Sequence, residues 1–237
     1  MQRYFARDKK NNELFLNEDD IRHIKLVMRM KDNDLIEVIF DDNLYICSII
    51  GINENISFKI EKQVKQKFDE QVKVRLIVPV LKEQKMDYIL QKSTELGVFE
   101  IVPVLTERTL VKLDEKDAVK KVDRWQKIVK EASEQSKRNT IPLVRNVTNL
   151  KDLKLENGLC LFCSTVEKEN NIKKIFSNLI NCDTINIVVG PEGGLSINEE
   201  ELLKNKGYES VSLGKRILRV ETAPLFVLSV INYIYME

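Results

Sequence analysis

The stretch GPEGGLSINEEE, residues 190–201, decides how the second half of this chain is organised. The chain has eight glycines in 237 residues, and three of them fall within the first five positions of this stretch. The apolar run INIVVG (185–190) precedes it and is typical of a buried strand. Ser196 can then cap a helix, because Glu199 three residues later completes a capping box. The sequence therefore places the glycines between a strand end and a helix start.

This glycine loop fits two explanations. In open α/β sheets, ligands bind where strands pass into helices, and glycine lets a ligand approach the backbone closely. A tight turn without any ligand accounts for the same composition. The spacing matches neither G-x-x-x-x-G-K-[ST] nor G-x-G-x-x-G. A ligand here would be held by backbone atoms, and it would not be a Walker or Rossmann nucleotide.

A second loop of the same kind follows one strand–helix unit later. YESVSLG (208–214) is strand-like and ends in glycine, and KRILRVETAP (215–224) comes next. Thr222 can cap the following helix, whose first turn holds Pro224. Neighbouring loops at one edge of a sheet can form a single pocket, so we expect both loops to line the same site.

The rest of the chain predicts two domains. The first 70 residues hold short β-type runs, LIEVIF (35–40), LYICSIIGI (44–52) and ISFKIEKQV (56–64), and one helix that begins after Asn17. From residue 72 onward, strand-like and helical segments alternate, which predicts a mostly parallel sheet covered by helices. We place the boundary near residues 65–72 and expect domains at 1–70 and 71–237.

Composition narrows the class of protein. Apolar residues make up 43% of the chain and charged residues 32%, as in a soluble globular protein. No apolar run approaches the roughly 20 residues of a membrane span, and the N-terminus has no secretory h-region, so we expect a cytoplasmic protein. The net charge is +1, but residues 71–150 hold 16 basic and 11 acidic residues, a difference of +5. That excess suits RNA, or simply a solvated helix face.

Cysteine and histidine usage argues against metal and hydrolytic chemistry. Cys160 and Cys163 form a CxxC, but residues three apart on a strand point to opposite faces. Further zinc ligands would have to come from Cys47, Cys182 or His23, so we expect no metal site. A Ser-His-Asp hydrolase would depend on His23, and no nucleophile elbow is present.

Both loops carry a family resemblance. VGPEGGLS (189–196) and LGKRILRVETA (213–223) resemble the signature loops of the RsmE family, which are SPOUT-class RNA methyltransferases acting on N3 of a uridine in 16S ribosomal RNA. Further similarity, in the same order along nearly the whole chain, lies in RYF (3–5), HIKLVMRM (23–30), LQKSTELGV (90–98), TERT (106–109) and EASEQSKR (131–138). The family's glycine-aspartate pair after the first helix is Asn33-Asp34 here. Asparagine also tolerates positive φ, so the turn is expected to persist.

The resemblance implies a fold, a cofactor and partners. The fold is α/β, with a small N-terminal PUA-like β-barrel that binds RNA and a C-terminal SPOUT domain whose mostly parallel sheet carries a trefoil knot. The cofactor is S-adenosyl-L-methionine, held bent by the two loops. The protein would be a homodimer that acts on 16S rRNA in the small ribosomal subunit.

It also implies roles for single residues. Glu192 and Glu221 are the carboxylates that could accept the uridine N3 proton, and Arg219 could stabilise charge on a uracil oxygen. A positioned water is the other candidate for accepting the proton. Capping of backbone amides is the alternative for either carboxylate, and it is favoured for Glu221. A salt bridge to Glu221 is the alternative for Arg219. The expected cofactor-binding residues are Thr165, Val189, Gly190, Glu192, Gly193, Gly194, Leu213, Gly214, Ile217, Leu218, Arg219, Thr222 and Ala223. The expected RNA contacts are Arg3, Arg7, His23, Arg29, Gln135, Ser136 and Arg138. For His23 a core or capping role is the alternative, and Trp125 is predicted to be a core residue.

The last helix supports the homodimer from the residues alone. In PLFVLSVINYIYM (224–236) only Ser229 and Asn232 are clearly polar, so apolar side chains go round the whole helix. The segment is too short to span a bilayer, and a two-fold partner is the simplest cover for its second face.

Two other functions would keep this fold. One is a non-catalytic RNA-binding protein associated with the ribosome, although such a protein would not need the glycine loops. The other is a SPOUT methyltransferase that acts on another base or RNA, because loops, and not the fold, set specificity.

Overall fold

Contacts group the chain into two units. The first comprises Met1–Asp69 and Ser133–Thr140, and the second comprises Glu70–Ala132 and Ile141–Glu237. The predicted boundary near 65–72 lies mostly outside the described residues. The division into domains 1–70 and 71–237 stays a prediction. It does not include Ser133–Thr140 in the first domain, whereas the contacts group these residues with the first unit. The computed structural model describes residues 1–53, 56–65, 72–154, 156–177 and 182–235.

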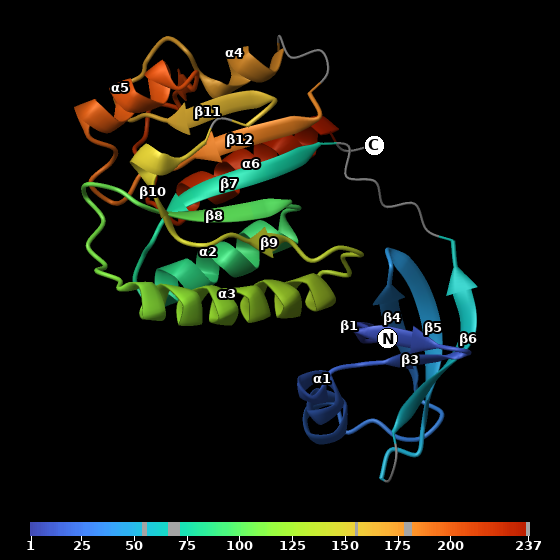
Figure 1. Cartoon of the computed structure of the whole chain (residues 1–237). Helices are drawn as coiled ribbons and strands as arrows, with labels where there is room; N and C mark the ends of the chain where they lie inside the picture. Colours follow the sequence, from blue (N-terminus) through green and yellow to red (C-terminus); the bar gives the residue numbers. More distant parts are fainter. Residues whose placement is uncertain (54–55, 66–71, 155, 178–181, 236–237) are drawn as a thin grey trace. The chain divides into compact units, whose positions relative to one another are not determined.

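The first unit is built on a six-stranded sheet with the strand order β1-β4-β5-β6-β3-β2 (Figure 1). Strand β1 pairs with β4 in parallel, and the other neighbours are antiparallel. The three predicted runs are strands β4, β5 and β6, whereas three-residue strands such as β1 are too short to show an alternation. The strands are β1 (Arg3–Phe5), β2 (Asp8–Lys10), β3 (Glu13–Phe15), β4 (Leu35–Phe40), β5 (Asn43–Ile50) and β6 (Ser57–Val64).

The helix predicted after Asn17, over DDIRHIKLVMRM (19–30), is confirmed at its start, but the α-helix is shorter than this segment. The Asn17 side chain accepts a hydrogen bond of 2.9 Å from the Asp20 amide and caps α1 (Glu18–Arg22). The helix continues as a π-helical turn, η1 (His23–Val27). Arg29 has a φ of 52°, which ends the helical path before Met30. Asn33 has a φ of 71°, so the predicted positive-φ turn is confirmed.

The second unit is a parallel sheet with the strand order β10-β8-β7-β12-β11-β13, and β9 pairs with β8. Every pairing in it is parallel, as the alternation of strands and helices predicted. The two-residue strands β9 and β10 were not anticipated. The strands are β7 (Lys73–Pro79), β8 (Glu100–Leu105), β9 (Leu143–Val144), β10 (Thr148–Asn149), β11 (Leu159–Cys163), β12 (Thr184–Val188) and β13 (Glu209–Val211).

Helices cover both faces of this sheet (Figure 1). One hydrophobic core joins the sheet to α2, α3, α4 and α6, and it contains Trp125, which is buried as predicted. The other core contains Leu203 of α5 and Leu150 of η2. Cys160 belongs to the second core and Cys163 packs against the first, so the two thiols do point to opposite faces. The helices are α2 (Glu83–Glu95), α3 (Glu115–Gln135), η2 (Leu150–Asp152), α4 (Ile172–Ser177), α5 (Ile197–Asn205) and α6 (Thr222–Tyr235).

Local signals set the ends of these helices. Gly97 has a φ of 83° and follows α2, where the sequence predicted a C′ glycine. The Ser196–Glu199 capping box is present at the start of α5. Both features use contacts within four residues, so they form wherever the chain is locally helical.

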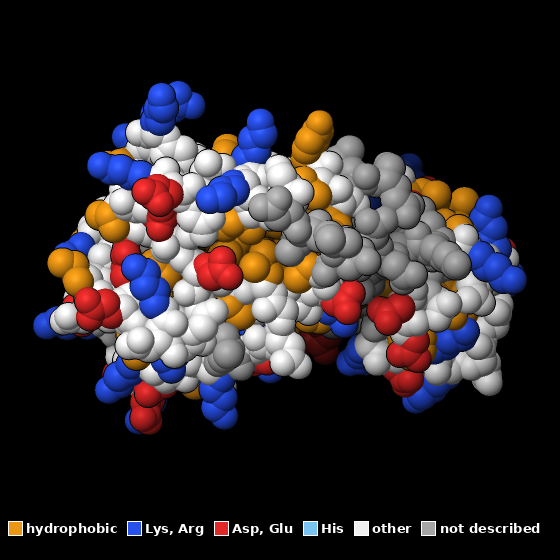
Figure 2. Space-filling view, turned by 90° about the horizontal axis from the view of Figure 1, so that it is seen from above, with side chains coloured by type: hydrophobic (Ala, Val, Ile, Leu, Met, Phe, Trp, Pro, Cys, Tyr) orange, Lys and Arg blue, Asp and Glu red, His pale blue; other side chains and the backbone are white. Residues whose placement is uncertain are grey.

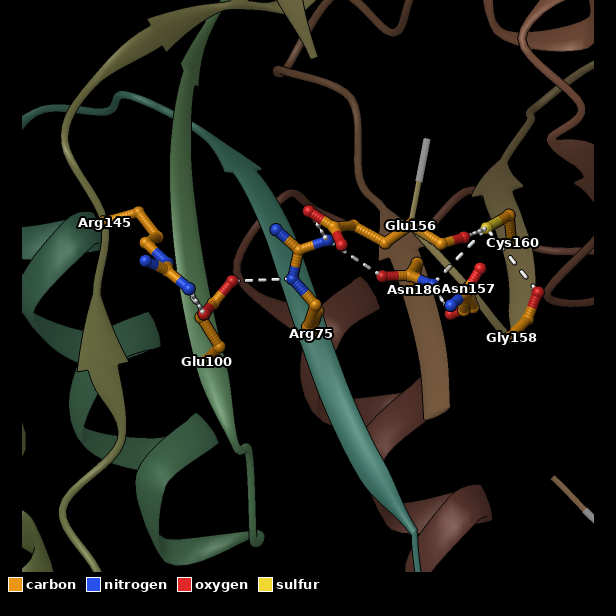
Figure 3. A network of polar contacts seen from close by, with 8 residues as sticks. All are labelled: Arg75, Glu100, Arg145, Glu156, Asn157, Gly158, Cys160 and Asn186. Carbon is orange, nitrogen blue, oxygen red and sulfur yellow. Dashed lines mark hydrogen bonds and ion pairs between the residues drawn. The ribbon is translucent and has the colours of Figure 1, made fainter. Parts of the chain in front are cut away.

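A polar network runs across neighbouring strands on the face of the sheet that also carries Cys160 (Figure 3). The buried Glu100 carboxylate accepts hydrogen bonds from Arg75 at 2.6 Å and from Arg145 at 2.7 Å. Asn186, which is fully buried, accepts from Arg75 at 3.2 Å and donates to the Cys160 sulfur at 3.3 Å. Four neighbouring strands, β8, β7, β12 and β11, are thus joined by side chains as well as by backbone pairing. Burial raises the pKa of the Cys160 thiol, so it stays protonated and inert.

The surface carries charges of both signs. In the view of Figure 2, lysine and arginine side chains alternate with aspartate and glutamate, and hydrophobic side chains show between them. No helix among the described residues is long and apolar enough to cross a membrane.

Candidate cofactor and catalytic site

A cavity of about 380 Å³ lies where strands β11, β12 and β13 end. Its volume falls in the range of small-molecule sites. The loops after these three strands form its wall, so the two glycine loops do line one site, as predicted. The lining residues are Lys85, Cys163, Ser164, Thr165, Val189, Gly190, Pro191, Glu192, Gly194, Ser212, Leu213, Gly214, Lys215, Arg216, Ile217, Leu218, Arg219, Val220, Glu221 and Ala223. All the expected cofactor residues are among them except Gly193 and Thr222.

The first loop forms a tight turn and also lines the cavity. Its glycines therefore fit both explanations, a tight turn and a backbone surface that a ligand can approach. A Cβ built on Gly190 would lie 2.9 Å from the Leu195 amide nitrogen, which leaves no room for a side chain. Gly194 has a φ of 70°, and its amide donates to the Pro191 carbonyl at 2.8 Å. A side chain at either position would force the backbone to move.

Gly193 lies differently. It is not among the cavity-lining residues, and a Cβ built on it would lie 3.3 Å from Cδ of Arg108. The Arg108 guanidinium donates to the carbonyl oxygen of Gly193 at 2.5 Å and to that of Leu195 at 3.3 Å. The expected cofactor contact of Gly193 stays a prediction, and the structure adds that this glycine makes room for the Arg108 side chain.

A second contact ties the same two segments together. The Glu199 carboxylate is buried, and it accepts from the Glu107 amide at 2.8 Å as well as from the Ser196 amide at 2.9 Å. Glu107 and Arg108 lie on a turn that Thr109 closes, because its hydroxyl oxygen accepts a hydrogen bond of 2.9 Å from the Thr106 amide. The TERT segment (106–109) therefore clamps the glycine loop.

Four charged side chains meet at the cavity. Lys85 from α2 donates to Glu192 at 2.8 Å, and its ammonium lies 3.8 Å from Glu221. The hydrogen bond from Lys85 lowers the pKa of the Glu192 carboxyl, and the same bond raises the pKa of Lys85. The Arg219 guanidinium lies 4.0 Å from Glu221 and is 85% exposed. The salt bridge expected as the alternative role of Arg219 is therefore present, but it is long and solvent-exposed.

Glu221 has a buried oxygen, Oε2, with no hydrogen-bond donor among the described residues. The alternative role, capping of backbone amides, is wrong, because no described backbone amide donates to this carboxylate. A buried carboxylate oxygen without a donor is costly, and a ligand that brings a donor would relieve that cost. The cavity therefore fits a ligand with N–H or O–H groups.

Lys85 was missed by sequence reasoning. It lies in the helical run KEQKMDYIL, where nothing in the pattern separates it from the neighbouring lysine, and it reaches Glu192 across 107 residues. No periodicity or spacing signal could have identified it.

The predicted RNA-contacting residues all belong to the first unit. Arg3 is a correction: its side chain is 4% exposed, pairs with Glu37 at 2.8 Å, and donates to the Asn139 side chain and the Lys137 carbonyl. A guanidinium that is buried and already bonded to three partners is not available to a phosphate. His23 is half-buried, with Nδ1 3.0 Å from the Tyr4 hydroxyl. The remaining residues differ in accessibility: Arg7, Arg29 and Gln135 are exposed, whereas Ser136 and Arg138 are half-buried.

Comparison with known families places both units. The RNA methyltransferase domain family matches residues 68–232, and the RNA methyltransferase PUA domain family matches residues 16–61. The chain is 34% identical to ribosomal RNA small subunit methyltransferase E of Bacillus subtilis, covering 98% of this chain and 96% of that protein. It is 36% identical to the protein of the same name from Mesomycoplasma hyopneumoniae, over 97% and 98% of the two chains.

Solved structures agree. A ribosomal RNA small subunit methyltransferase E of Neisseria gonorrhoeae, bound to S-adenosyl methionine, has a TM-score of 0.87 and 30% identity over 98% of this chain and 97% of that chain. A methyltransferase of Legionella pneumophila in complex with the same cofactor has a TM-score of 0.90 and 28% identity over 98% and 96%. The α/β SPOUT fold with an N-terminal PUA-like unit is thus confirmed.

Proposed function

The chain belongs to the RNA methyltransferase family that includes the ribosomal RNA small subunit methyltransferases E, and from this premise we propose that it transfers a methyl group from S-adenosylmethionine to N3 of a uridine in 16S rRNA. The observation that carries the proposal is the cavity at the strand ends, which is lined by glycine backbone and by Glu221, whose buried Oε2 has no hydrogen-bond donor among the described residues.

The residues present fit S-adenosylmethionine. The cavity is walled by backbone at Val189–Gly190 and Leu213–Gly214, which suits an adenine read through main-chain groups. Ile217 and Leu218 add apolar surface for the ring. When bound, the cofactor supplies a methyl group that is already activated by a positive sulfur.

The protein's own task is alignment and proton removal. N3 of uridine carries a proton that must leave, and a carboxylate at hydrogen-bond reach can accept it. Glu192 is poorly suited, because Lys85 already binds it and lowers its pKa. Glu221 keeps an oxygen without a donor, so we assign proton acceptance to Glu221.

Arg219 would stabilise the uracil as it loses that proton. Negative charge then develops on O2 and O4, and a guanidinium beside them lowers the barrier. Its side chain lines the cavity and is mostly exposed, with only a 4.0 Å contact to Glu221, so it has room to turn toward a substrate.

The remaining features of the proposal concern the whole protein. We propose that residues 1–70 form the RNA-binding domain, that residues 71–237 form the methyltransferase domain with a trefoil knot, and that the protein acts in the cytoplasm. We further propose a homodimer through α6. This helix buries Val227, Leu228 and Ile231 but leaves Phe226, Tyr233 and Ile234 exposed.

One experiment tests the reaction and its target together. Small ribosomal subunits from a strain that lacks this protein are incubated with the purified enzyme and S-adenosylmethionine, and the rRNA nucleosides are analysed by mass spectrometry. We expect 3-methyluridine in 16S rRNA, present with the enzyme and absent without it. Another methylated nucleoside would replace the assignment of N3 of uridine, and no methylation with retained subunit binding would favour the non-catalytic RNA-binding alternative.

A further inference from the structure

A second cavity of about 670 Å³ adjoins the cofactor cavity, and no residue assigned so far to RNA or to the reaction lies in its outer part. The two cavities share Thr165 and the segment Ser212–Lys215 as a common wall. The outer part is formed by Glu167, Lys168, Asn171, Ile172 and Lys173.

We propose that this second cavity binds a backbone phosphate of the RNA substrate next to the target base, through Lys168, Lys173 and Lys215. The proposal rests on the proposed function for the identity of the substrate. Its physical basis is the charge of the lining residues and their place beside the cofactor cavity.

The cations of this cavity are available to a ligand. Lys168, Lys173 and Lys215 are exposed, and none of them forms an ion pair within the part of the chain that the structure describes. This differs from Lys85, which is bound to Glu192, and from Lys92, which is bound to Glu95. Unpaired ammonium groups around one hollow are what a phosphate site requires.

The one carboxylate in the lining does not cancel them. Glu167 accepts from the Glu169 amide at 2.9 Å, the Asn170 amide at 3.0 Å and the Ser210 hydroxyl at 2.6 Å. These hydrogen bonds, that from Ser210 of β13 first, lower the pKa of Glu167 to about 2, so its charge is held by Ser210 and by amides of its own loop over the whole working range of pH. Three lysines and one glutamate leave a formal charge of +2 around the cavity.

The position argues for an RNA phosphate over a stray anion. A group bound in the second cavity is separated from the cofactor only by Thr165 and Ser212–Lys215. A nucleotide whose base enters the cofactor cavity brings its own phosphates to the surroundings of that cavity. Phosphate contacts of this kind fix the register of the nucleic acid and leave the reading of the base to the catalytic cavity.

The test uses a charge-neutralising double variant, Lys168→Gln with Lys173→Gln, and leaves Lys215 in place because it also lines the cofactor cavity. The matched control is Lys116→Gln with Lys120→Gln on α3. These two lysines are exposed. Their helix is bound through Gln126 to β9, which lies toward one edge of the sheet, whereas Ser212 follows β13 at the opposite edge. Both variants lose two positive charges, so a difference between them cannot come from net charge.

Binding to unmodified small ribosomal subunits is measured by filter binding over a range of salt concentrations, with S-adenosylhomocysteine present to prevent turnover. We expect Lys168→Gln/Lys173→Gln to bind about 10-fold more weakly at about 0.1 M salt, and its log–log salt slope to fall by about 1 to 2. The control should change by less than about 3-fold. Lys168→Arg/Lys173→Arg should restore binding, because arginine keeps the charge.

Calorimetry with S-adenosylhomocysteine and with inorganic phosphate separates the other occupants. Unchanged S-adenosylhomocysteine affinity in the double variant supports the proposal, whereas a loss would assign the cavity to the cofactor and overturn it. Inorganic phosphate that binds tightly and does not compete with the ribosomal subunit would also overturn it, as would equal subunit affinity in the double variant and the control. The binding assay does not require turnover. If the enzyme proves to methylate a base position other than uridine N3, the proposed function is refuted, but the binding assay still tests the phosphate site.

Discussion

The guanidinium of Arg108 donates a hydrogen bond of 2.5 Å to the carbonyl oxygen of Gly193, although the two residues are 85 positions apart in the sequence. With the 3.3 Å contact to Leu195, it binds the glycine loop at two residues that are not among those lining the cavity. The loop that walls the cofactor cavity is therefore held by a segment that does not itself line the cavity. Its conformation depends on Arg108 as well as on its own glycines.

We predict that Arg108→Ala weakens cofactor binding by about 10-fold, equivalent to about 1.4 kcal/mol, because the loop must then be ordered by the ligand. Turnover at saturating cofactor should change little, since Arg108 touches no reacting atom. Calorimetry with S-adenosylmethionine measures the first effect. Arg124→Ala, which removes an exposed ion pair with Asp87, is the control and should leave affinity unchanged. Equal affinities in the two variants would show that the loop needs no clamp.

Two glycines of the same loop should respond differently to alanine. Gly190→Ala places Cβ 2.9 Å from a backbone nitrogen, so the loop must shift and cofactor affinity should fall by about 10-fold or more. Gly193→Ala meets only the Arg108 side chain at 3.3 Å, which can move, so affinity should fall by less than about 3-fold. Calorimetry on both folded variants checks the order. A greater loss at Gly193 would return this residue to the cofactor contacts.

We predict that Glu221→Gln lowers the single-turnover rate by about 100-fold, because glutamine cannot accept the N3 proton. Glu192→Gln should lower it far less, since Glu192 is already bound by Lys85. Rates are measured with saturating cofactor and unmodified small ribosomal subunits. Similar rates for Glu221→Gln and the unmodified enzyme would remove Glu221 from the mechanism, and a larger effect at Glu192 would exchange the two roles.

The network in Figure 3 predicts a large loss of stability on removing Glu100. Its side chain is 4% exposed and binds two arginines, of which Arg75 is 13% exposed. Glu100→Ala removes the shortest partner of Arg75 and leaves it a longer 3.4 Å pair with Glu156 and the bond to Asn186, so it should cost about 3 kcal/mol in the free energy of unfolding. Urea denaturation measures it. Glu95→Ala, which breaks the exposed pair with Lys92, is the control and should cost about 0.5 kcal/mol or less. A similar cost for both would mean that the network adds no stability.

The exposed side of α6 predicts an association between two copies. Tyr233 is 81% exposed on a helix with hardly any polar residues, so Tyr233→Asp should place a charge in the proposed dimer interface. We expect a folded protein with the mass of a monomer by light scattering. Lys204→Asp on α5 serves as an exposed control and should remain a dimer. A monomeric wild-type protein at micromolar concentration would refute the homodimer.

The sequence by itself predicted those features that depend on neighbours along the chain. The Asn17 cap, the Ser196–Glu199 capping box and the positive φ of Gly97 involve residues within four positions of each other, so their signals are local. The alternation of β and α segments determined a parallel sheet, and parallel strands end at one edge, so both glycine loops were expected at one site. The cofactor residues that the family resemblance implied lie mostly in these two loops, and most of them line the cavity.

Only the tertiary structure decided which distant side chains meet. Lys85 reaches Glu192 across 107 residues, Arg108 reaches Gly193 across 85, and Arg3 is buried against Glu37 and Asn139. A lysine or arginine has the same local pattern whether it ends in solvent, in an ion pair or behind a loop. Its role is decided by which strands and helices pack beside it, and that packing is a sum of many long-range contacts that no short stretch of sequence contains.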